Sequence, residues 1–497
     1  MQDRSEPTRG RVSLVTLGCA RNEVDSEELA ARLAVAGWEL TDDMAAADVA
    51  VINTCGFIEQ AKKDSIDILL QAADVRADAD TTTRAVVAVG CLAQRYGKEL
   101  AEQLPEADAV LGFDSYPELA GHLRSVLAGR PPPAHQPQDR RRLLPVTPVA
   151  RPSAAAGVSL PGHGTRAGAG PGTSRPASGP PVLRRRLGNE PWAPLKIASG
   201  CDRRCAFCAI PAFRGAMVSR PPEDVLAEAQ WLAARGVREV LLVSENTTSY
   251  GKDLGDLHAL EALLPRLAAV PGIDRVRVSY LQPAEIRPGT IEAIAATEGV
   301  AAYFDLSFQH AAPRVLRAMR RFGDPDAFLG LIERIRALHP QAGIRSNVIV
   351  GFPGETEAEL GLLGDFLAAA ELDVVGVFGY SDEEGTAAAQ LPGKHDEDEI
   401  RARVAAASSL VEHVSDAAAR ARIGQQVRVL VEGGDEDAGE GSEESAFTAG
   451  VVGRGEHQGP QIDGVVRLTG AHRAGTMVDA VVVDSCGVDL YAEVPGR

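Results

Sequence analysis

Apolar runs alternate with amphipathic segments along the first 130 residues. Three runs, RVSLVTLGC, ADVAVINTC and RAVVAVGC, are short, continuous and rich in valine, as buried parallel strands are. Between them, apolar positions recur with a helical period over Asp25–Trp38 and Phe57–Ala73. This strand–helix alternation predicts an α/β fold with a flavodoxin-like parallel sheet for residues 1–130.

The same alternation returns after residue 190. Helical periodicity is clearest at Pro222–Gly236 and Asp326–His339, and a charged, alanine-rich helix is expected at 396–423. The six strand-like runs are LKIAS, VREVLLVS, RVRVSY, AYFDLSF, IRSNVIVGF and VVGVFGY. Six such units predict a central partial (β/α)6 barrel over residues 191–420, with its chemistry at the C-terminal ends of the strands.

The last part of the chain has a different pattern. Short strand-like runs separated by glycine-rich turns predict a small β-barrel over residues 421–497. An insertion at Glu432–Ser445 carries seven acidic residues and no basic one, which favours a disordered loop.

Residues 131–190 interrupt the alternation. They include 12 Pro, 8 Gly and no aromatic residue, and nine Arg against one Asp and one Glu give them a local charge of +7. Such a composition buries little apolar surface, so we predict a flexible linker. Its arginines could contact RNA or the ribosome, or the segment could be a solvated insertion.

Composition narrows the class of protein. The formal charge of −18 opposes general binding to nucleic acid and favours a basic protein partner, although acidity could also serve solubility alone. No apolar run approaches the length of a membrane span, so we expect no membrane association. An odd count of seven cysteines and the lack of an export signal indicate a cytoplasmic protein whose clustered thiols bind metal or take part in catalysis.

Three cysteines lie in SGCDRRCAFCAIP with C-x3-C-x2-C spacing, at Cys201, Cys205 and Cys208. A structural zinc site takes four ligands, so zinc is the weaker reading. In a 4Fe-4S cluster, three thiolates leave one iron open to the amine and carboxylate of a small molecule. This spacing on one loop after the first barrel strand is typical of radical S-adenosylmethionine (SAM) enzymes.

Two other segments are similar to SAM-binding motifs of that superfamily. Glu245 follows the second barrel strand, where a carboxylate would bind the SAM amine; a solvated acid is the alternative. The run Asn347–Glu355 resembles the glycine motif that packs against adenine, so Gly351 and Glu355 are predicted cofactor contacts. A strand followed by an ordinary turn would read the same way. His310 is interpreted as structural.

A second cysteine triad follows the N-terminal strands. Cys19, Cys55 and Cys91 each come at the end of a strand of one predicted parallel sheet, and adjacent strands lie about 4.8 Å apart. The three loops can therefore converge on a second three-ligand 4Fe-4S cluster, with its open iron available to a sulfur species. Asn22 and Asn53 could donate hydrogen bonds to it. Buried free cysteines are the competing interpretation.

Over nearly its whole length the chain resembles the radical SAM methylthiotransferases. The resemblance is carried by LGCARNEVDSE, NTCGFI, VGCLAQRY, SGCDRRCAFCAIPAFRG and GFPGET, and by IDGVVRL and DLYAEV in a TRAM-like C-terminal segment. The segments LLVSENTTSYG and YSDEEGTAAAQLP are closer to the branch that modifies an aspartate of small-subunit ribosomal protein twelve than to the tRNA-modifying branch.

The resemblance implies a methylthiotransferase domain, a radical SAM domain and a TRAM-like domain that recognises the substrate. One cluster would generate a radical from SAM, and the other would supply sulfur to the aspartate β-carbon. Partners would be the ribosomal protein, free or within its subunit, a sulfur donor and an electron donor. A tRNA adenosine methylthiotransferase and a non-catalytic iron–sulfur carrier are the alternatives. The long linker and the acidic insertion depart from the family pattern.

Overall fold

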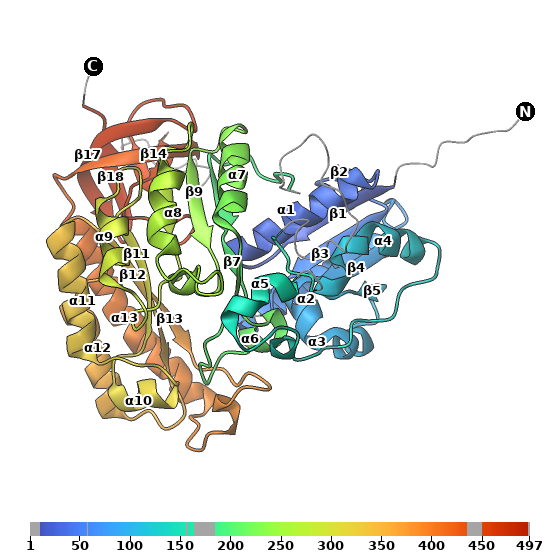
Figure 1. Ribbon diagram of the computed structural model, residues 1–497, viewed down its shortest axis with the longest axis horizontal. Coiled ribbons are helices and arrows are strands. Elements are labelled where there is room, and N and C mark those ends of the chain that lie inside the picture. Colours follow the sequence, from blue (N-terminus) through green and yellow to red (C-terminus); the bar gives the residue numbers. More distant parts are fainter. Residues whose placement is uncertain (1–9, 57, 156–157, 164–183, 435–449, 496–497) are drawn as a thin grey trace, which may run out of the picture.

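The structure, a computed structural model, describes residues 10–56, 58–155, 158–163, 184–434 and 450–495. Figure 1 shows an N-terminal α/β body, a larger central α/β body beside it, and a small β-barrel at one end of the central body. Within the described residues, no helix has the length and hydropathy needed to span a membrane.

Five parallel strands form the N-terminal sheet in the order β2-β1-β3-β4-β5. This is the flavodoxin-like order, which confirms the fold predicted from the alternating pattern. The strands are β1 (Arg11–Thr16), β2 (Glu39–Thr41), β3 (Val49–Thr54), β4 (Ala85–Val89) and β5 (Ala109–Val110).

Helices cover both faces of this sheet, which explains why its strands are continuously apolar. On β3, Val49 and Val51 pack with α1 and α4, whereas Ala50 and Ile52 pack with α2 and α3. The bounds are α1 (Ala20–Val35), α2 (Glu59–Ala77), α3 (Gly90–Gln103), the 3-10 turn η1 (Phe113–Glu118) and α4 (Leu119–Leu127).

The described parts of the connecting segment 131–190 are packed, which differs from the flexible linker predicted above. Buried Arg140 pairs with Asp114 at 3.0 Å, and buried Arg184 pairs with Glu27 and Glu228. Ion pairs thus fix a segment that has few apolar residues. Its elements are η2 (Arg140–Arg142), η3 (Pro148–Ala150) and α5 (Arg151–Ala154), and residues 156–157 and 164–183 lie outside the described ranges.

The central body is the predicted six-stranded partial barrel. Its strands form two parallel sheets, β6-β9-β10 and β11-β12-β13, joined by bridges from Val276 to Val300 and from Leu281 to Leu306. The strands are β6 (Trp192–Lys196), β9 (Glu239–Val243), β10 (Arg275–Val278), β11 (Tyr303–Gln309), β12 (Gly343–Val350) and β13 (Val374–Gly379).

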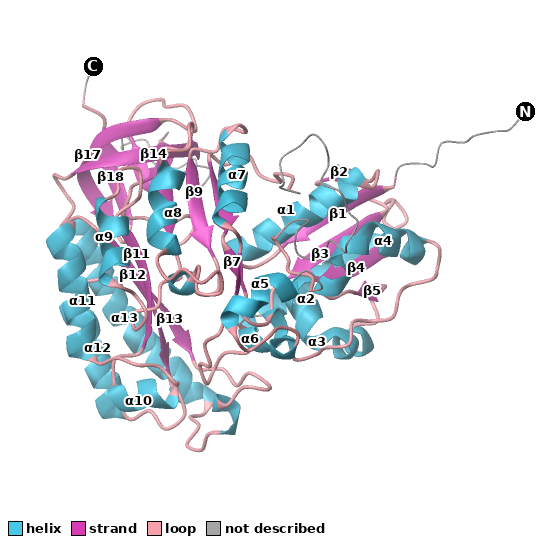
Figure 2. Cartoon of the chain, viewed as in Figure 1, coloured by secondary structure: helices cyan, strands magenta, loops and turns pink. Residues whose placement is uncertain are grey.

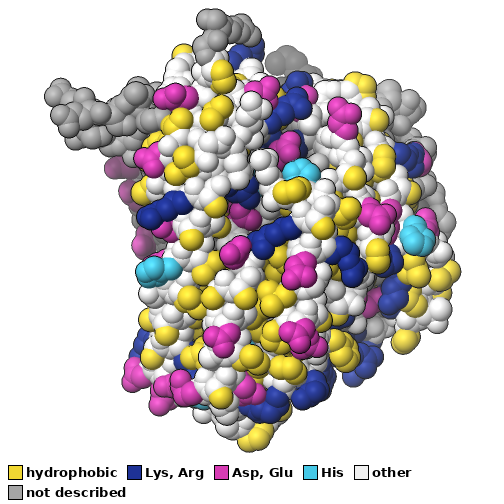
Figure 3. All heavy atoms as spheres, turned by 90° about the vertical axis from the view of Figure 1, so that its left-hand side faces the viewer, with side chains coloured by type: hydrophobic (Ala, Val, Ile, Leu, Met, Phe, Trp, Pro, Cys, Tyr) yellow, Lys and Arg dark blue, Asp and Glu magenta, His cyan; other side chains and the backbone are white. Residues whose placement is uncertain are grey.

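Helices lie along the outside of these strands (Figure 2). They are α7 (Pro222–Ala233), α8 (Ala259–Ala268), α9 (Pro288–Ala296), α10 (Pro313–Ala318), α11 (Pro325–Leu338), α12 (Glu357–Ala370) and α13 (Glu397–Arg420). Shorter elements near the cysteine loop and the strand ends are β7 (Ala198–Ser199), α6 (Ile210–Arg214), β8 (Val218–Ser219), η5 (Thr247–Ser249) and η6 (Ala388–Gln390). On the face shown in Figure 3, acidic and basic side chains are interspersed.

The C-terminal segment forms a closed barrel in the order β14-β15-β16-β18-β17, as predicted. It docks at the N-terminal ends of the central strands, where Glu239 binds Arg275, Arg277 and Arg454. Its strands are β14 (Gln426–Gly434), β15 (Val451–Arg454), β16 (Val466–Leu468), β17 (Met477–Cys486) and β18 (Asp489–Glu493). The disorder predicted for the acidic insertion falls mainly on 435–445, outside the described residues.

Candidate active site

A short antiparallel ribbon holds the two ends of the cysteine loop together. Strands β7 and β8 pair on either side of the loop, and the Cys201 N–H donates to the Gly215 carbonyl at 3.1 Å. Gly200 has φ +82°, and a Cβ there would lie 2.2 Å from the Ala216 oxygen. Only glycine fits this position, which explains why a glycine directly precedes Cys201.

The three cysteines of the loop, Cys201, Cys205 and Cys208, line one cavity of about 400 Å³. The central body contributes side chains at or after its strand C-terminal ends, and the N-terminal body closes the wall with Arg21 and residues 58–60. The cavity therefore lies where a barrel of this kind places its chemistry, and it belongs to both bodies.

Burial shifts the pKa of two thiols in this loop, Cys201 and Cys208. Desolvation raises the pKa of Cys208 to about 12 and raises that of Cys201 well above the ordinary thiol value. The Arg203 backbone N–H donates to Cys201 Sγ at 3.4 Å, and Arg321 Nη1 donates to Cys205 Sγ at 3.7 Å. Donors aimed at the sulfurs suit thiolates that lose their protons when a metal cluster binds.

Three thiols on one loop are one ligand short of a structural zinc site, which takes four. Over the described residues, no three His, Cys, Asp or Glu side chains form a group that could hold a metal ion. A cubane cluster is wider than one ion, because each thiolate binds a different iron. The three-cysteine loop on a shared cavity is thus a better match for a cluster than for zinc.

Glu245 faces the same cavity as a buried carboxylate without hydrogen bonds. Its side chain is 1% exposed, and neither carboxylate oxygen has a hydrogen-bond partner in the structure. Its nearest cations are Arg214 Nε at 3.6 Å and Arg21 Nη1 at 3.9 Å. A buried carboxylate in this state is suited to an ammonium ligand, because an unsatisfied buried acceptor is costly.

Two further cavity residues adopt unusual backbone conformations. Tyr280, after β10, has φ +61°, and Gln309, at the end of β11, has φ +70°. Non-glycine residues in the left-handed region are uncommon and cluster at functional sites. Their positions support the assignment of this cavity as the site.

The structure does not place the other two predicted cofactor contacts on the cavity wall. Gly351 has φ +73°, and its N–H donates to both oxygens of the Glu355 carboxylate at 3.1 Å. That carboxylate also binds Arg403 at 2.6 Å and His310 at 3.3 Å. Glu355 therefore fixes the glycine turn to α13, and His310 has the structural position expected of it.

The three N-terminal cysteines are brought together by contacts between successive loops. A Cβ at Gly18 would lie 2.8 Å from Cys55 Sγ, and a Cβ at Gly56 would lie 3.0 Å from the Cys91 carbonyl carbon. Cys19 is the N-cap of α1, and Cys91 lies in the first turn of α3. Helix N-termini favour negative charge, so these positions stabilise thiolates.

The electrostatic environments of this triad differ. Although burial acts to raise the pKa of Cys19, the Arg21 guanidinium lowers it below the ordinary thiol value. Burial raises the pKa of Cys91, an effect that Arg214 partly offsets. Metal binding at Cys91 must therefore displace a firmly held proton.

The two asparagines near these loops tie backbone segments together. Asn22 Nδ2 donates to the carbonyls of Leu17 and Thr54, and its Oδ1 accepts from Cys91 Sγ at 3.4 Å. Asn53 Nδ2 donates to the Asn22 carbonyl and to Ser26 Oγ. Their amide donors are thus already used, which differs from the predicted donation to cluster sulfurs.

Two arginines that sequence reasoning missed connect the cysteine triads. Arg214, at the end of α6, donates to Cys91 Sγ at 3.1 Å and to Asp25 at 3.0 Å. Arg21 donates to Cys19 Sγ at 3.5 Å and lines the cavity beside the second triad. Each lies in a cysteine motif, at CARN and AIPAFRG, and that proximity was the available signal.

A buried ion triplet joins the two bodies at the cavity wall. Glu383, in the loop after β13, binds Lys62 of α2 at 2.8 Å and Arg95 of α3 at 2.5 Å. It lies in the segment YSDEEGTAAAQLP and lines the cavity. The relative position of the two triads is therefore fixed by charged contacts on both sides of the cavity.

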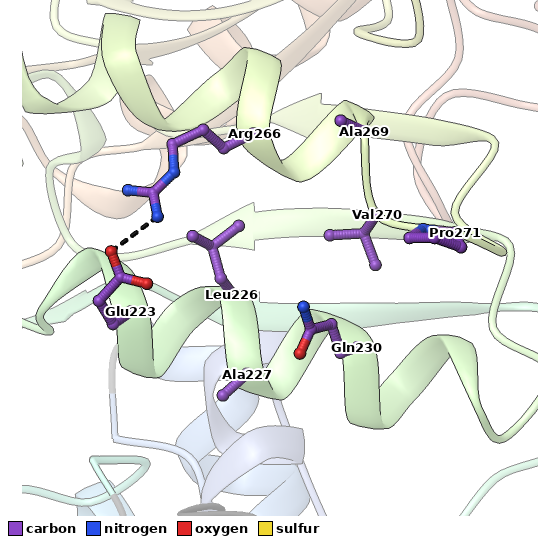
Figure 4. A pocket seen from close by; sticks show the side chains of 8 residues that line it. All are labelled: Glu223, Leu226, Ala227, Gln230, Arg266, Ala269, Val270 and Pro271. Atoms are coloured by element: carbon purple, nitrogen blue, oxygen red, sulfur yellow. Dashed lines mark hydrogen bonds and ion pairs between the residues drawn. The ribbon is translucent and has the colours of Figure 1, made fainter.

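A separate hollow of about 390 Å³ lies between α7 and α8 (Figure 4). Its charged groups are the exposed pair of Glu223 and Arg266 at 2.6 Å, and its other lining residues are aliphatic or proline apart from the amide of Gln230. The drawn side chains include no cysteine, and the two charged groups satisfy each other. This hollow therefore lacks the unpaired groups expected of a reactive site.

Comparison with known families divides the chain into three matched regions. Residues 11–112 match a family described as uncharacterized protein family UPF0004, residues 195–367 match the radical SAM superfamily, and residues 423–494 match the TRAM domain. These regions correspond to the N-terminal sheet, the central barrel and the C-terminal barrel.

Several similar proteins have the name ribosomal protein uS12 methylthiotransferase RimO. The protein from Kineococcus radiotolerans is 59% identical and the alignment covers 98% of each chain. The protein from Nocardioides is 61% identical over 97% of this chain and 96% of the relative. The protein from Streptomyces coelicolor is 60% identical over 98% and 97%.

Among solved structures, the chain is similar to the radical SAM methyltransferase TsrM from Kitasatospora setae. The form with tryptophan and a SAM analogue gives a TM-score of 0.51 at 16% identity, covering 74% of this chain and 72% of that one. The form with cobalamin and a [4Fe-4S] cluster gives 0.50 at 17% identity, covering 75% of each. At these identities the likeness is one of fold.

Proposed function

The chain belongs to the RimO family of ribosomal protein uS12 methylthiotransferases, within the radical SAM superfamily, and we propose that it attaches a methylthio group to an aspartate β-carbon of uS12. We assign residues 1–130 to a methylthiotransferase domain, 191–420 to a radical SAM domain and 421–497 to a TRAM-like domain, with 131–190 connecting the first two.

The observation that carries this proposal is that the cavity lined by Cys201, Cys205 and Cys208 is also lined by Arg21, which contacts a cysteine of the other triad. Arg21 contacts Cys19 Sγ and lines the cavity beside Cys201, although Arg21 and Cys201 lie 180 positions apart in the sequence. A radical source and a sulfur source must both reach one substrate carbon. A shared cavity supplies that geometry.

We propose that Cys201, Cys205 and Cys208 hold a 4Fe-4S cluster whose open iron binds SAM. When bound, the cluster supplies the electron that cleaves the sulfonium of SAM to a 5′-deoxyadenosyl radical. Glu245 would accept hydrogen bonds from the SAM ammonium, because it is a buried carboxylate without another donor. Gly351 and Glu355, which lie outside the cavity lining, would act on the cofactor through the glycine turn that their hydrogen bonds hold.

A second 4Fe-4S cluster is proposed at Cys19, Cys55 and Cys91. Its three loops touch one another, and two thiols lie at helix N-termini. Arg21 and Arg214 place positive charge beside the sulfurs of Cys19 and Cys91, which balances the negative charge of thiolate ligands. An external sulfur donor and an electron donor are required by this chemistry.

The proposed protein partner fits the charge of the chain. A net charge of −18 favours association with a basic protein and opposes association with RNA. The TRAM-like barrel lies at the opposite strand ends from the cavity, so we propose that it contacts the substrate or its surroundings at a second place. A uS12 substrate implies action in the cytoplasm.

The test is a reaction of the reconstituted, reduced chain with SAM, a sulfide source and purified uS12. Mass spectrometry of uS12 should find the added mass of one methylthio group on one aspartate. A parallel reaction with tRNA, digested to nucleosides, examines the alternative substrate. Methylthioadenosine derivatives in that digest, with unmodified uS12, would assign the chain to the tRNA branch instead.

A further inference from the structure

Arg21 is a buried cation whose hydrogen-bonding capacity is poorly used. The residue is 9% exposed, yet its guanidinium makes only two hydrogen bonds, to Cys19 Sγ at 3.5 Å and a long one to the Ser244 carbonyl at 3.4 Å. Its Nη2 donates to no group that the structure describes, and the nearest carboxylate, on Glu245, is 3.9 Å away. The ring of Tyr280 lies 4.9 Å from the guanidinium carbon.

Two other buried arginines, Arg277 and Arg151, are much better satisfied. Arg277 donates to Glu239 at 2.9 Å and to the carbonyls of Glu456 and Gly455 at 2.6 and 3.1 Å. Arg151 donates five hydrogen bonds to carboxylate and carbonyl oxygens. Because unused donors on a buried cation are costly, Arg21, whose anionic neighbours are the Cys19 sulfur and the more distant Glu245 carboxylate, retains donor capacity for a further anion.

The remaining cations of the cavity already have partners. Arg203 binds Glu285 at 2.5 Å, and Arg321 donates to the Ser307 carbonyl. Among the cations that line the cavity, Arg21 therefore has the most hydrogen-bond donors left for an anionic group that enters. Planar guanidinium groups bind carboxylates through two parallel hydrogen bonds, for which Nη1 and Nη2 are suited.

The position of Arg21 also matches the proposed substrate. It touches the sulfur of Cys19, so it lies beside the triad from which sulfur would be transferred. The carboxylate of an aspartate is bonded directly to the β-carbon that must approach that sulfur source. The carboxylate of SAM, in contrast, would be neutralised by the open iron of the other cluster.

We infer that Arg21 binds the side-chain carboxylate of the substrate aspartate and thereby selects aspartate over its neutral amide. This inference rests on the proposed function and adds a substrate-binding residue to it. The Arg21 cation holds the carboxylate in the cavity, so the adjacent β-carbon faces both cysteine triads.

The test compares the reconstituted parent chain with Arg21→Gln and Arg21→Lys on two substrates. These are uS12 and uS12 in which the target aspartate is replaced by asparagine. In Arg21→Gln we expect KM for uS12 to rise about 10- to 100-fold, the range for losing hydrogen bonds to a charged group. The preference for aspartate over asparagine should fall by a similar factor, and Arg21→Lys should restore part of both.

The matched control is Arg235→Gln, which removes an arginine stacked on Trp231 away from the cavity and should leave both quantities unchanged. Iron content, the electron paramagnetic resonance spectrum and 5′-deoxyadenosine formation without uS12 report on folding and on the clusters. The inference is overturned if Arg21→Gln keeps the parent preference for aspartate, or if KM rises for SAM and not for uS12. If the parent itself leaves uS12 unmodified, the proposed function fails instead.

Discussion

In the candidate site, the cysteines are the candidate cluster ligands, and Arg21 and Arg214 place positive charge beside their sulfurs. The six candidate cluster ligands could be predicted from the sequence because they lie at fixed positions: three within eight residues, and three at strand ends. Arg21, Arg214 and Glu383 could not be assigned roles in this way. Their contacts join residues more than a hundred positions apart, which only the folded chain shows.

Replacing one cysteine from each triad should give two different defects, because the two triads have different proposed roles. We expect Cys201→Ala to reduce 5′-deoxyadenosine formation to the level without protein, since the SAM-binding cluster loses a ligand. Cys55→Ala should still cleave SAM but should transfer no methylthio group. Both products can be quantified by mass spectrometry in the same reaction.

Cys486→Ala is the control for that pair, because Cys486 is exposed at the end of β17. It should match the parent in both products. Loss of SAM cleavage in Cys55→Ala, with full cluster content at the other triad, would contradict the division of roles.

Helices and strands could be predicted from the sequence where one hydrophobic pattern dominates a segment. The parallel sheet, the six barrel strands and the small β-barrel follow from continuous or alternating apolar runs. The connecting segment was not predictable, because its order depends on ion pairs with distant acids. Arg151 donates from Nη1 to both carboxylate oxygens of Asp202, at 2.6 and 2.8 Å, and Asp202 directly follows Cys201 in the cluster loop.

Breaking the contact between Arg151 and Asp202 should make the cysteine loop less rigid, so that it holds its iron less tightly. We expect Arg151→Met to lose iron from the radical SAM cluster to a chelator several-fold faster than the parent, as followed by absorbance. The exchange of both residues, Arg151→Asp with Asp202→Arg, should recover part of the difference. Arg141→Met is the control, since Arg141 is exposed and pairs with its near neighbour Asp139. Equal iron loss in Arg151→Met and the control would contradict a positioning role.

At the scale of the whole molecule, charged clusters hold the three bodies together. Glu383 joins the N-terminal and central bodies, and Glu239 joins the central body to the C-terminal barrel. Around Glu239, Arg275 also donates to the Arg428 carbonyl at 2.6 Å, so the barrel is fixed by several strong contacts. The sequence predicts the three bodies but not their arrangement, because docking depends on pairs between separate bodies.

Glu239→Gln should destabilise this junction strongly. It leaves three buried arginines without their shared anion, which costs about 3–5 kcal/mol for a broken buried pair. Thermal unfolding should begin at a clearly lower temperature than in the parent. Glu223→Gln, at an exposed pair with Arg266, should cost less than about 1 kcal/mol. Equal midpoints for the two variants would contradict the account of the junction.

The Glu239 carboxylate also makes the stability of this junction depend on pH. Although burial acts to raise the pKa of Glu239, Arg277 and the two other arginines hold that pKa well below the ordinary glutamate value. Its stabilisation is therefore fully present above the unfolded-state pKa and is lost as pH falls toward the folded-state pKa. The difference in unfolding midpoint between the parent and Glu239→Gln should narrow as pH falls from the unfolded-state glutamate pKa toward pH 3. A constant difference would contradict this linkage.

The proposed activity can be tested in cells by measuring the mass of uS12 from strains with and without the gene for this chain. We predict that uS12 from the parent strain carries one methylthio group on an aspartate, that deletion removes it, and that the intact gene restores it whereas a Cys55→Ala gene does not. An unchanged uS12 mass after deletion, with a methylthio group lost from tRNA nucleosides, would contradict the account.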